Sequence, residues 1–328
     1  MLTPINKAAT GGQHTTARPV SPSSRMLPTT RFTDPAAVEA WDSWFRWRDG
    51  SGLRDLDIDA TWWRVANALA VVEGPFSPLL VRHLVNAFCR WSLLPDERLL
   101  QYAGTDTRIE ELDSPAAVLN VAAFVSSPLT GLARFDRDSF MATAGLAVHL
   151  LDNALTLFSS ARLPVALSIG VIGLTDAMRY LGCPLSSTEA REHAREIAMC
   201  LAEGCLRGSV LLASERGSPV TPSERSRLAE RWRERGMPES LVADALAHGV
   251  RHTSLTAIQP HPRLAALANN VADAATPARY PTWQAPAPAG GPMQFSAAQG
   301  NLLAAMQPWI DAPIRTSGIS RAEEAPRI

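Results

Sequence analysis

Apolar residues recur at steps of three and four positions along most of this chain, the spacing of helices with one buried face. The pattern is clearest over residues 137–157, which we predict to be a buried amphipathic helix. Ser187 is placed to cap a second long helix. The apolar stripe of that helix comprises Ala190, Ala194, Ile197, Leu201, Cys205, Gly208 and Leu212. We therefore interpret Cys205 as a small buried hydrophobic residue.

The N-terminal third predicts a small helical lobe rich in tryptophan. Residues 33–35 (TDP) indicate a helix cap followed by a proline in the first turn. One face of the helix that follows would carry Val38, Trp41, Trp44 and Phe45. Further helices are expected over residues 59–72 and 78–91. We expect the aromatic side chains to pack as a core rather than to form a ligand cage.

The rest of the chain adds more helix than strand. Strands are predicted over 165–171, where Gly170 permits close backbone approach, and over 251–258. Helices are predicted over residues 174–181, 222–236, 238–249 and 263–275. The chain should therefore have about eight helices and two or three strands, a mainly helical α+β fold.

Composition divides the chain into four parts. Residues 1–32 have no acidic group and are rich in Ser, Thr, Pro and Gly, so we expect a disordered tail, although they superficially suggest a transit peptide. The Trp-rich lobe takes residues 33–110 and a core domain takes 111–280. Residues 281–328 begin with repeated Pro, Ala and Gly, which favours a linker and a C-terminal arm.

Charge and cysteine content exclude several classes of function. With 31 basic and 32 acidic residues the net charge is −1, so neither nucleic acid nor an anionic membrane is an expected partner. Polar residues interrupt the apolar runs, so no membrane-spanning helix is expected. The four cysteines form no C-x-x-C pair, and His248 and His252 are separated by a helix-ending glycine, so no metal site is expected. Reduced cysteines favour a cytoplasmic protein.

Three blocks in the C-terminal half carry a recognisable pattern. They are residues 150–153 (LLDN), 168–176 (SIGVIGLTD) and 212–217 (LASERG). In this order they resemble the L-D-N-V, I-G-L-G-V-M-G-L-A-D and L-A-x-E-R-G blocks of the ribonucleotide reductase large chain. Weaker matches to the family's N-terminal helical region lie at 59–70, 93–96 and 103–105. The resemblance implies a remnant of the family's ten-stranded α/β barrel.

The large central segment of the family is missing from the resemblance. Residues 103–105 lie only a short distance before 119–125 (LNVAAFV), which matches the I-N-L-A-R-F-V that follows the family's radical motif. No N-x-C-x-E motif occurs in this chain. Aligning Asn120 with the motif asparagine would place Ala122 at the radical cysteine and Phe124 at the glutamate. We therefore assign no catalytic residue.

The turn at residues 257–264 (AIQPHPRL) resembles the family's phosphate-holding turn, A-I-A-P-T-G-T-I. Here Pro262 removes a backbone N–H, while Arg263 offers a guanidinium and His261 a second donor. His261 and Arg263 are the candidate phosphate ligands. The competing interpretation is that both residues only cap a turn or face water.

These patterns favour a non-catalytic protein that binds a nucleotide or a partner, or acts as a scaffold. An open sheet has edges to cover, so a protein partner or self-association is expected. Whether the chain is an enzyme stays open. The alternative is a reductase completed by a second chain, or a changed chemistry on a nucleotide-like substrate. The cofactor is unknown, and cobalamin or a radical-generating partner is implied only by that alternative.

Overall fold

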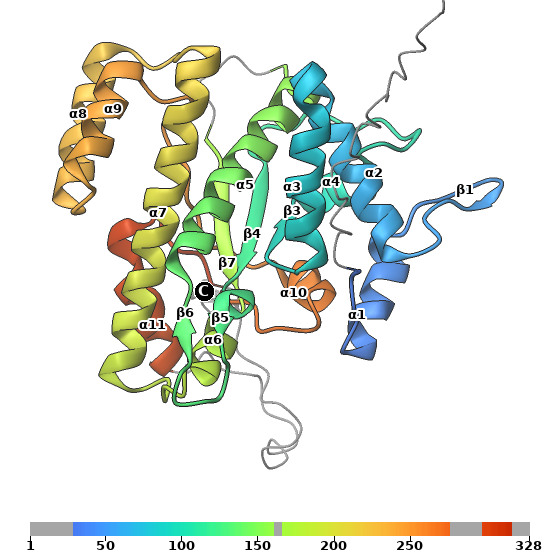
Figure 1. Cartoon of the computed structure of the whole chain (residues 1–328), viewed down its shortest axis with the longest axis horizontal. Helices are drawn as coiled ribbons and strands as arrows, with labels where there is room; N and C mark the ends of the chain where they lie inside the picture. Colours follow the sequence, from blue (N-terminus) through green and yellow to red (C-terminus); the bar gives the residue numbers. More distant parts are fainter. Residues whose placement is uncertain (1–28, 161–165, 276–296, 317–328) are drawn as a thin grey trace, which may run out of the picture.

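The computed structural model describes residues 29–160, 166–275 and 297–316 (Figure 1). The α-helices are α1 (Pro35–Ala40), α2 (Ile58–Ala70), α3 (Ser77–Cys89), α4 (Glu97–Tyr102), α5 (Arg137–Phe158), α6 (Leu174–Tyr180), α7 (Thr188–Arg216), α8 (Pro222–Glu234), α9 (Glu239–His248), α10 (Pro262–Leu267) and α11 (Ala297–Met306). Tighter or wider turns form η1 (Trp41–Phe45), η2 (Val71–Phe76), η3 (Val121–Phe124) and η4 (Gln307–Trp309). The strands are β1 (Arg48–Asp49), β2 (Gly52–Leu53), β3 (Leu93–Pro95), β4 (Ala116–Asn120), β5 (Val125–Ser126), β6 (Arg134–Phe135) and β7 (Ser168–Ile172).

A three-stranded sheet of order β3-β4-β7 lies at the centre of the molecule. β3 is antiparallel to β4, and β4 is parallel to β7, with Asn120 opposite Ile172. Single bridges join Ile169 to Thr256 and Ile172 to Asp273. Within the described residues this sheet does not close into a barrel. The predicted mainly helical α+β fold is confirmed.

The two long helices α5 and α7 lie side by side across the sheet (Figure 1). Asp136 caps α5 by accepting from the N–H of Ser139 at 3.1 Å, and Ser187 caps α7 by accepting from the N–H of Ala190 at 3.1 Å. Their predicted stripes are buried, including Cys205. Glycines at the crossing allow unusually close approach, since a Cβ on Gly204 would lie 2.5 Å from the carbonyl oxygen of Met141.

The Trp-rich lobe packs directly against this core. Trp62 forms a tilted ring contact with Phe88 and an edge contact with Trp91, while its indole N–H donates to Thr30 Oγ1 at 2.9 Å. β3 belongs to the lobe but pairs with β4, so lobe and core share one sheet and one hydrophobic core. Of the four residues predicted to share one face of the first helix, Trp41 and Phe45 are buried, whereas Val38 and Trp44 are exposed. The shared face is lost because the backbone widens into the π-turn η1 directly after α1.

Two predicted elements are shorter than expected. Residues 251–258 form only the bridge at Thr256 rather than a regular strand. The helix predicted over 263–275 spans only Pro262–Leu267. It ends because Asn269 and Asn270 take left-handed backbone angles, with φ of 59° and 58°.

The C-terminal segment covers one edge of the sheet. The N–H groups of Ala312 and Arg315 donate to the carbonyls of Thr256 and Ile258 at 3.1 Å and 2.9 Å. Asp311 Oδ2 accepts from the N–H of Leu255 at 2.9 Å, and α11 packs on α7. Residues 297–316 of the predicted arm therefore pack on the core. The rest of that arm, and the predicted tail up to residue 28, lie outside the described residues.

Three helical stretches have the length and hydropathy of membrane-spanning helices, contrary to the expectation drawn from interrupted apolar runs. They are Ile58–Cys89, Arg137–Phe158 and Thr188–Arg216. The first is broken at Gly74, whose φ of 53° separates two helices of thirteen residues. The other two bury their apolar stripes against each other and the sheet.

Candidate functional site

The two candidate phosphate ligands lie on the same turn but point into different surroundings. His261 is buried, and its backbone N–H donates to Asp273 Oδ2 at 2.8 Å. Burial lowers the pKa of the His261 imidazole, so the ring is kept neutral. Arg263 is half-exposed, stacks over Trp44 at 5.2 Å and pairs with Glu97 at 3.2 Å. Of these two residues, only Arg263 presents a cation to solvent, and that cation is already paired with the carboxylate of Glu97.

Asp273 lies beside this turn and is buried. Its two oxygens accept from the N–H groups of His261 and Ala275, at 2.8 Å and 3.1 Å. Burial raises the pKa of Asp273 despite these hydrogen bonds. The backbone N–H of His261 is therefore satisfied from within the protein.

The segment 119–125, which matches the family block that follows the radical motif, is packed among apolar groups. Asn120 ends β4, and its Oδ1 is buried without a hydrogen-bond partner among the described residues. Gly173, with φ of 68°, leaves room for it, since a Cβ there would lie 2.2 Å from Asn120 Oδ1. Ala122 is buried, and Phe124 packs edge-on against Phe140 at 5.0 Å. This part of the chain offers no thiol and no carboxylate for the family's chemistry.

The four cysteines lie away from that segment and are poor nucleophiles. Cys89 ends α3, Cys183 follows α6, and Cys200 and Cys205 lie within α7. All four are free thiols. Burial raises the pKa of each of them, that of Cys200 to about 11. Thiols of this kind stay protonated near neutral pH and react slowly.

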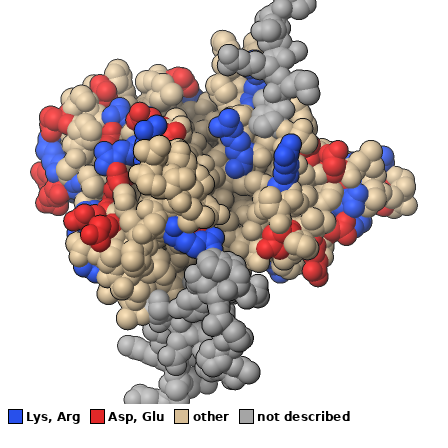
Figure 2. Space-filling model, turned by 60° about the horizontal axis from the view of Figure 1, so that its bottom comes forward, with Lys and Arg blue, Asp and Glu red and all other residues tan. Residues whose placement is uncertain are grey.

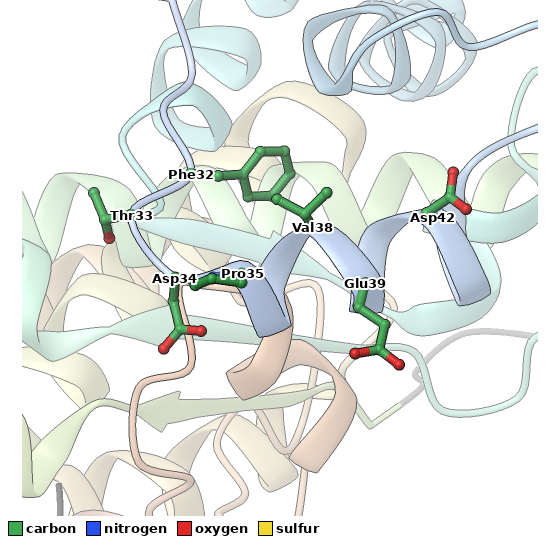
Figure 3. Close-up of a pocket in the computed structure, with 7 residues that line it drawn as sticks. All are labelled: Phe32, Thr33, Asp34, Pro35, Val38, Glu39 and Asp42. Carbon is green, nitrogen blue, oxygen red and sulfur yellow. The ribbon is translucent and has the colours of Figure 1, made fainter. Parts of the chain in front are cut away.

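A shallow depression of about 630 Å³ lies on the surface of α1 (Figure 3). Three of its lining residues are acidic and none is basic; the lining comprises Phe32, Thr33, Asp34, Pro35, Val38, Glu39 and Asp42. Asp42 is already paired with Arg46 at 2.7 Å. The acidic lining makes this depression unsuited to a phosphate. On the face shown in Figure 2, basic and acidic side chains intermix toward both sides, and the middle carries separate basic side chains.

A group of interacting polar side chains among the described residues brings together two of the sequence blocks. We call it the Asp152 cluster; it comprises Glu73, His149, Asp152, Asn153, Arg216, Arg251 and His252. Arg216 Nη1 lies 2.7 Å from Asp152 Oδ2 and 2.8 Å from Asn153 Oδ1, and Nη2 donates to Glu73. Asp152 is 1% exposed and also contacts Arg251 Nε at 3.3 Å and His252 Nε2 at 3.2 Å. The cluster ties α5 to the end of α7 and to the turn η2.

Charge in the Asp152 cluster is balanced internally. Burial alone would raise the pKa of Asp152, but contact with His252 and the charges of Arg251 and Arg216 hold it well below its usual range. Burial opposes ionisation of Glu73 too, yet hydrogen bonds from Asn153 and His149 lower its pKa. Two carboxylates face two guanidiniums, so no external ion is needed. The arrangement is that of a structural network rather than a catalytic acid–base pair.

The pKa directions predict that the folded state loses stability in acid. Asp152 and Glu73 have lowered pKa values when folded, so their contribution is present above their ordinary values of 3.8 and 4.5 and is lost as pH falls below them. His261 adds a loss below its ordinary value of 6.5, because burial disfavours its protonation. Asp273, with a raised pKa, opposes the trend. Urea unfolding at about pH 7, 5 and 3.5 should show the steepest loss in the last interval; a flat or rising profile would contradict the cluster's role.

Sequence analysis missed the cluster as a unit. Blocks 150–153 and 212–217 were identified, but nothing in the sequence pointed to Glu73, which lies 143 positions from Arg216. The L-D-N and E-R-G blocks could have suggested a carboxylate–guanidinium pair. They could not have suggested the third partner from η2.

A known family matches the part of the chain that contains most of the Asp152 cluster. The family model described as "Ribonucleotide reductase, barrel domain" matches residues 116–283, which is over half of the chain. The match begins at β4 and includes both blocks that meet in the Asp152 cluster. No curated protein matches the chain. The chain belongs to the ribonucleotide reductase barrel-domain family.

Proposed function

We propose that this chain is a non-catalytic member of the family, repurposed as a scaffold that binds a nucleotide or a protein partner. The observation that carries the proposal is the lack of an N-x-C-x-E motif in the chain, which leaves the family's chemistry without its thiol and its carboxylate. The family reaction uses a thiyl radical to abstract a ribose hydrogen, a carboxylate to move a proton, and two further thiols as reductant. Here the thiols are separated and protonated.

The folded core supports a binding role for what remains. The Asp152 cluster locks α5, α7 and η2 together without any group from outside the chain. The C-terminal segment covers one edge of the sheet. These features give the chain a stable body of its own, as a scaffold needs.

In the nucleotide-binding form of the proposal, Arg263 supplies the phosphate contact. Its guanidinium is half-exposed and held over Trp44, and Glu97 competes for it. Binding should therefore be weak and sensitive to salt. Calorimetric titration at low salt with nucleoside mono-, di- and triphosphates should give heats that disappear in Arg263→Ala and grow in Glu97→Gln.

A matched control for this titration is Arg233→Ala. Arg233 is similarly exposed and is paired with Glu239 at 2.7 Å, but it lies on α8 rather than on the turn. It should leave the heats unchanged. Equal heats for wild type and Arg263→Ala, or no heat from either at millimolar nucleotide, would exclude the nucleotide form and leave the partner form.

The alternative is a reductase completed by a second chain. It rests on the sheet, which stays open within the described residues. This alternative requires a companion chain that supplies the N-x-C-x-E motif and its strands. Purification from native cells, followed by mass spectrometry of the bound proteins, separates the two: a stoichiometric partner carrying that motif would favour the split enzyme.

A further inference from the structure

The turn between α2 and α3 displays three large apolar side chains to solvent. Val71, Phe76 and Leu79 are 60%, 73% and 55% exposed, and we call them the α2–α3 tip. Pro75 and Pro78 beside them are exposed as well. Apolar side chains gathered at one protruding turn generally mark an interaction surface.

The tip is held in this exposed arrangement by the rest of the fold. Glu73, within the same turn, accepts from Asn153 Nδ2 at 2.8 Å and from Arg216. Ser77 Oγ donates to the carbonyl of Ala70 at 2.6 Å, and Gly74 supplies the left-handed residue that reverses the chain. The side chains that flank Glu73 are therefore directed outward, while Glu73 itself is directed into the Asp152 cluster.

The helix behind the tip, with its C-cap Arg90, carries basic and no acidic side chains on its exposed face. Arg82, His83 and Arg90 are exposed and form no ion pair among the described residues. No acidic residue occurs between Gly74 and Pro95. Arg82 follows Leu79 by three residues, which places it about 4–5 Å farther along the helix axis. Although the net charge of the whole chain is −1, this region combines an apolar tip with basic side chains beside it.

We propose that the α2–α3 tip inserts into the headgroup region of a membrane that contains anionic lipid. Insertion to a depth of about 5–10 Å would bury the three apolar side chains and bring Arg82 and His83 level with the lipid phosphates. The tip is the end of the α2–α3 helical hairpin (Figure 1), so a fluid bilayer can surround it more readily than a protein helix can. This inference goes beyond the proposed function and does not depend on it.

Co-sedimentation of the full chain with vesicles tests the proposal. At low salt the protein should bind vesicles of phosphatidylcholine mixed with phosphatidylglycerol, bind phosphatidylcholine alone much less, and be released by about 0.5 M salt. The double variant Phe76→Ser/Leu79→Ser should weaken binding at least about tenfold, because its apolar area is lost. Arg82→Glu should weaken it about thirtyfold, because two units of charge change at the anionic surface.

The matched control uses two equally exposed leucines at the opposite end of the molecule. Leu129 and Leu132, in the β5–β6 loop, are 68% and 79% exposed, and Leu129→Ser/Leu132→Ser should bind vesicles as the wild type does. All these positions are exposed, so circular dichroism and melting should be unchanged. The proposal is overturned by absence of binding to anionic vesicles or by binding that survives both tip variants. A tip variant that changes the oligomeric state without lipid would also overturn it and reassign the tip to a protein interface.

Discussion

Replacing Arg216 by alanine should lower the free energy of unfolding by about 3–5 kcal/mol. The side chain is the common partner of Asp152, Asn153 and Glu73. Its removal would leave Asp152, which is almost fully buried, with weaker compensation from Arg251 and His252. An uncompensated buried carboxylate is costly, even where the intact pair contributes little net stability.

Arg207→Ala provides the control on the same helix. Arg207 pairs with Glu203 at 2.6 Å, but the arginine side chain is 52% exposed, so its loss should cost less than about 1 kcal/mol. Urea unfolding of both variants measures the difference. Equal small losses would show that the Asp152 cluster does not hold α5, α7 and η2 together. In Arg216→Ala the acid loss of stability should also begin at a higher pH, because Asp152 would no longer be held so far below its ordinary pKa.

Replacing Gly204 by valine should destabilise the fold by about 3 kcal/mol. A Cβ at this position would meet Met141 O at 2.5 Å and Met141 Cα at 2.8 Å, which are backbone atoms that cannot rotate away. α5 and α7 would have to move apart along their buried stripes. Gly204→Ala should cost less, since the gain in helix propensity of about 1 kcal/mol offsets part of the clash.

Gly300→Ala is the corresponding control. Gly300 also lies inside a helix, α11, but a Cβ there meets nothing within 4 Å. It should be neutral or stabilising by up to about 1 kcal/mol. Thermal melting of Gly204→Val, Gly204→Ala and Gly300→Ala ranks the three variants by stability. If Gly204→Val has the same melting temperature as the wild type, the close crossing of α5 and α7 does not require glycine at this position.

Local periodicity was enough to predict the long helices. Residues 137–157 and the stripe on α7 were predicted because their burial follows a 3.6-residue repeat that the sequence displays directly. Ser187 was recognisable as a cap because capping depends on neighbours in sequence. The same reasoning placed Cys205 inside the core.

Features that depend on distant residues could not be predicted in this way. Thr256 forms a bridge because β7 lies beside it, and Asp311 in the C-terminal segment engages the adjoining backbone. The end of α10 at Leu267, before Asn269, depends on backbone angles that asparagine permits but does not require. In the candidate site, the sequence identified His261 and Arg263 but gave no sign that Asp273 and Glu97 would engage them.

The most direct test of the account is a ribonucleotide reduction assay. It should compare the isolated chain with the complex purified from native cells, each supplied with ribonucleotides, a thiol reductant and candidate radical sources, including a cobalamin cofactor. We expect no deoxyribonucleotide above a no-protein control from either sample, because the chain has no N-x-C-x-E motif and its four thiols are kept protonated. Product from the isolated chain that disappears when any one of the four cysteines is replaced by alanine would contradict the account, and product from the complex alone would establish the split enzyme instead.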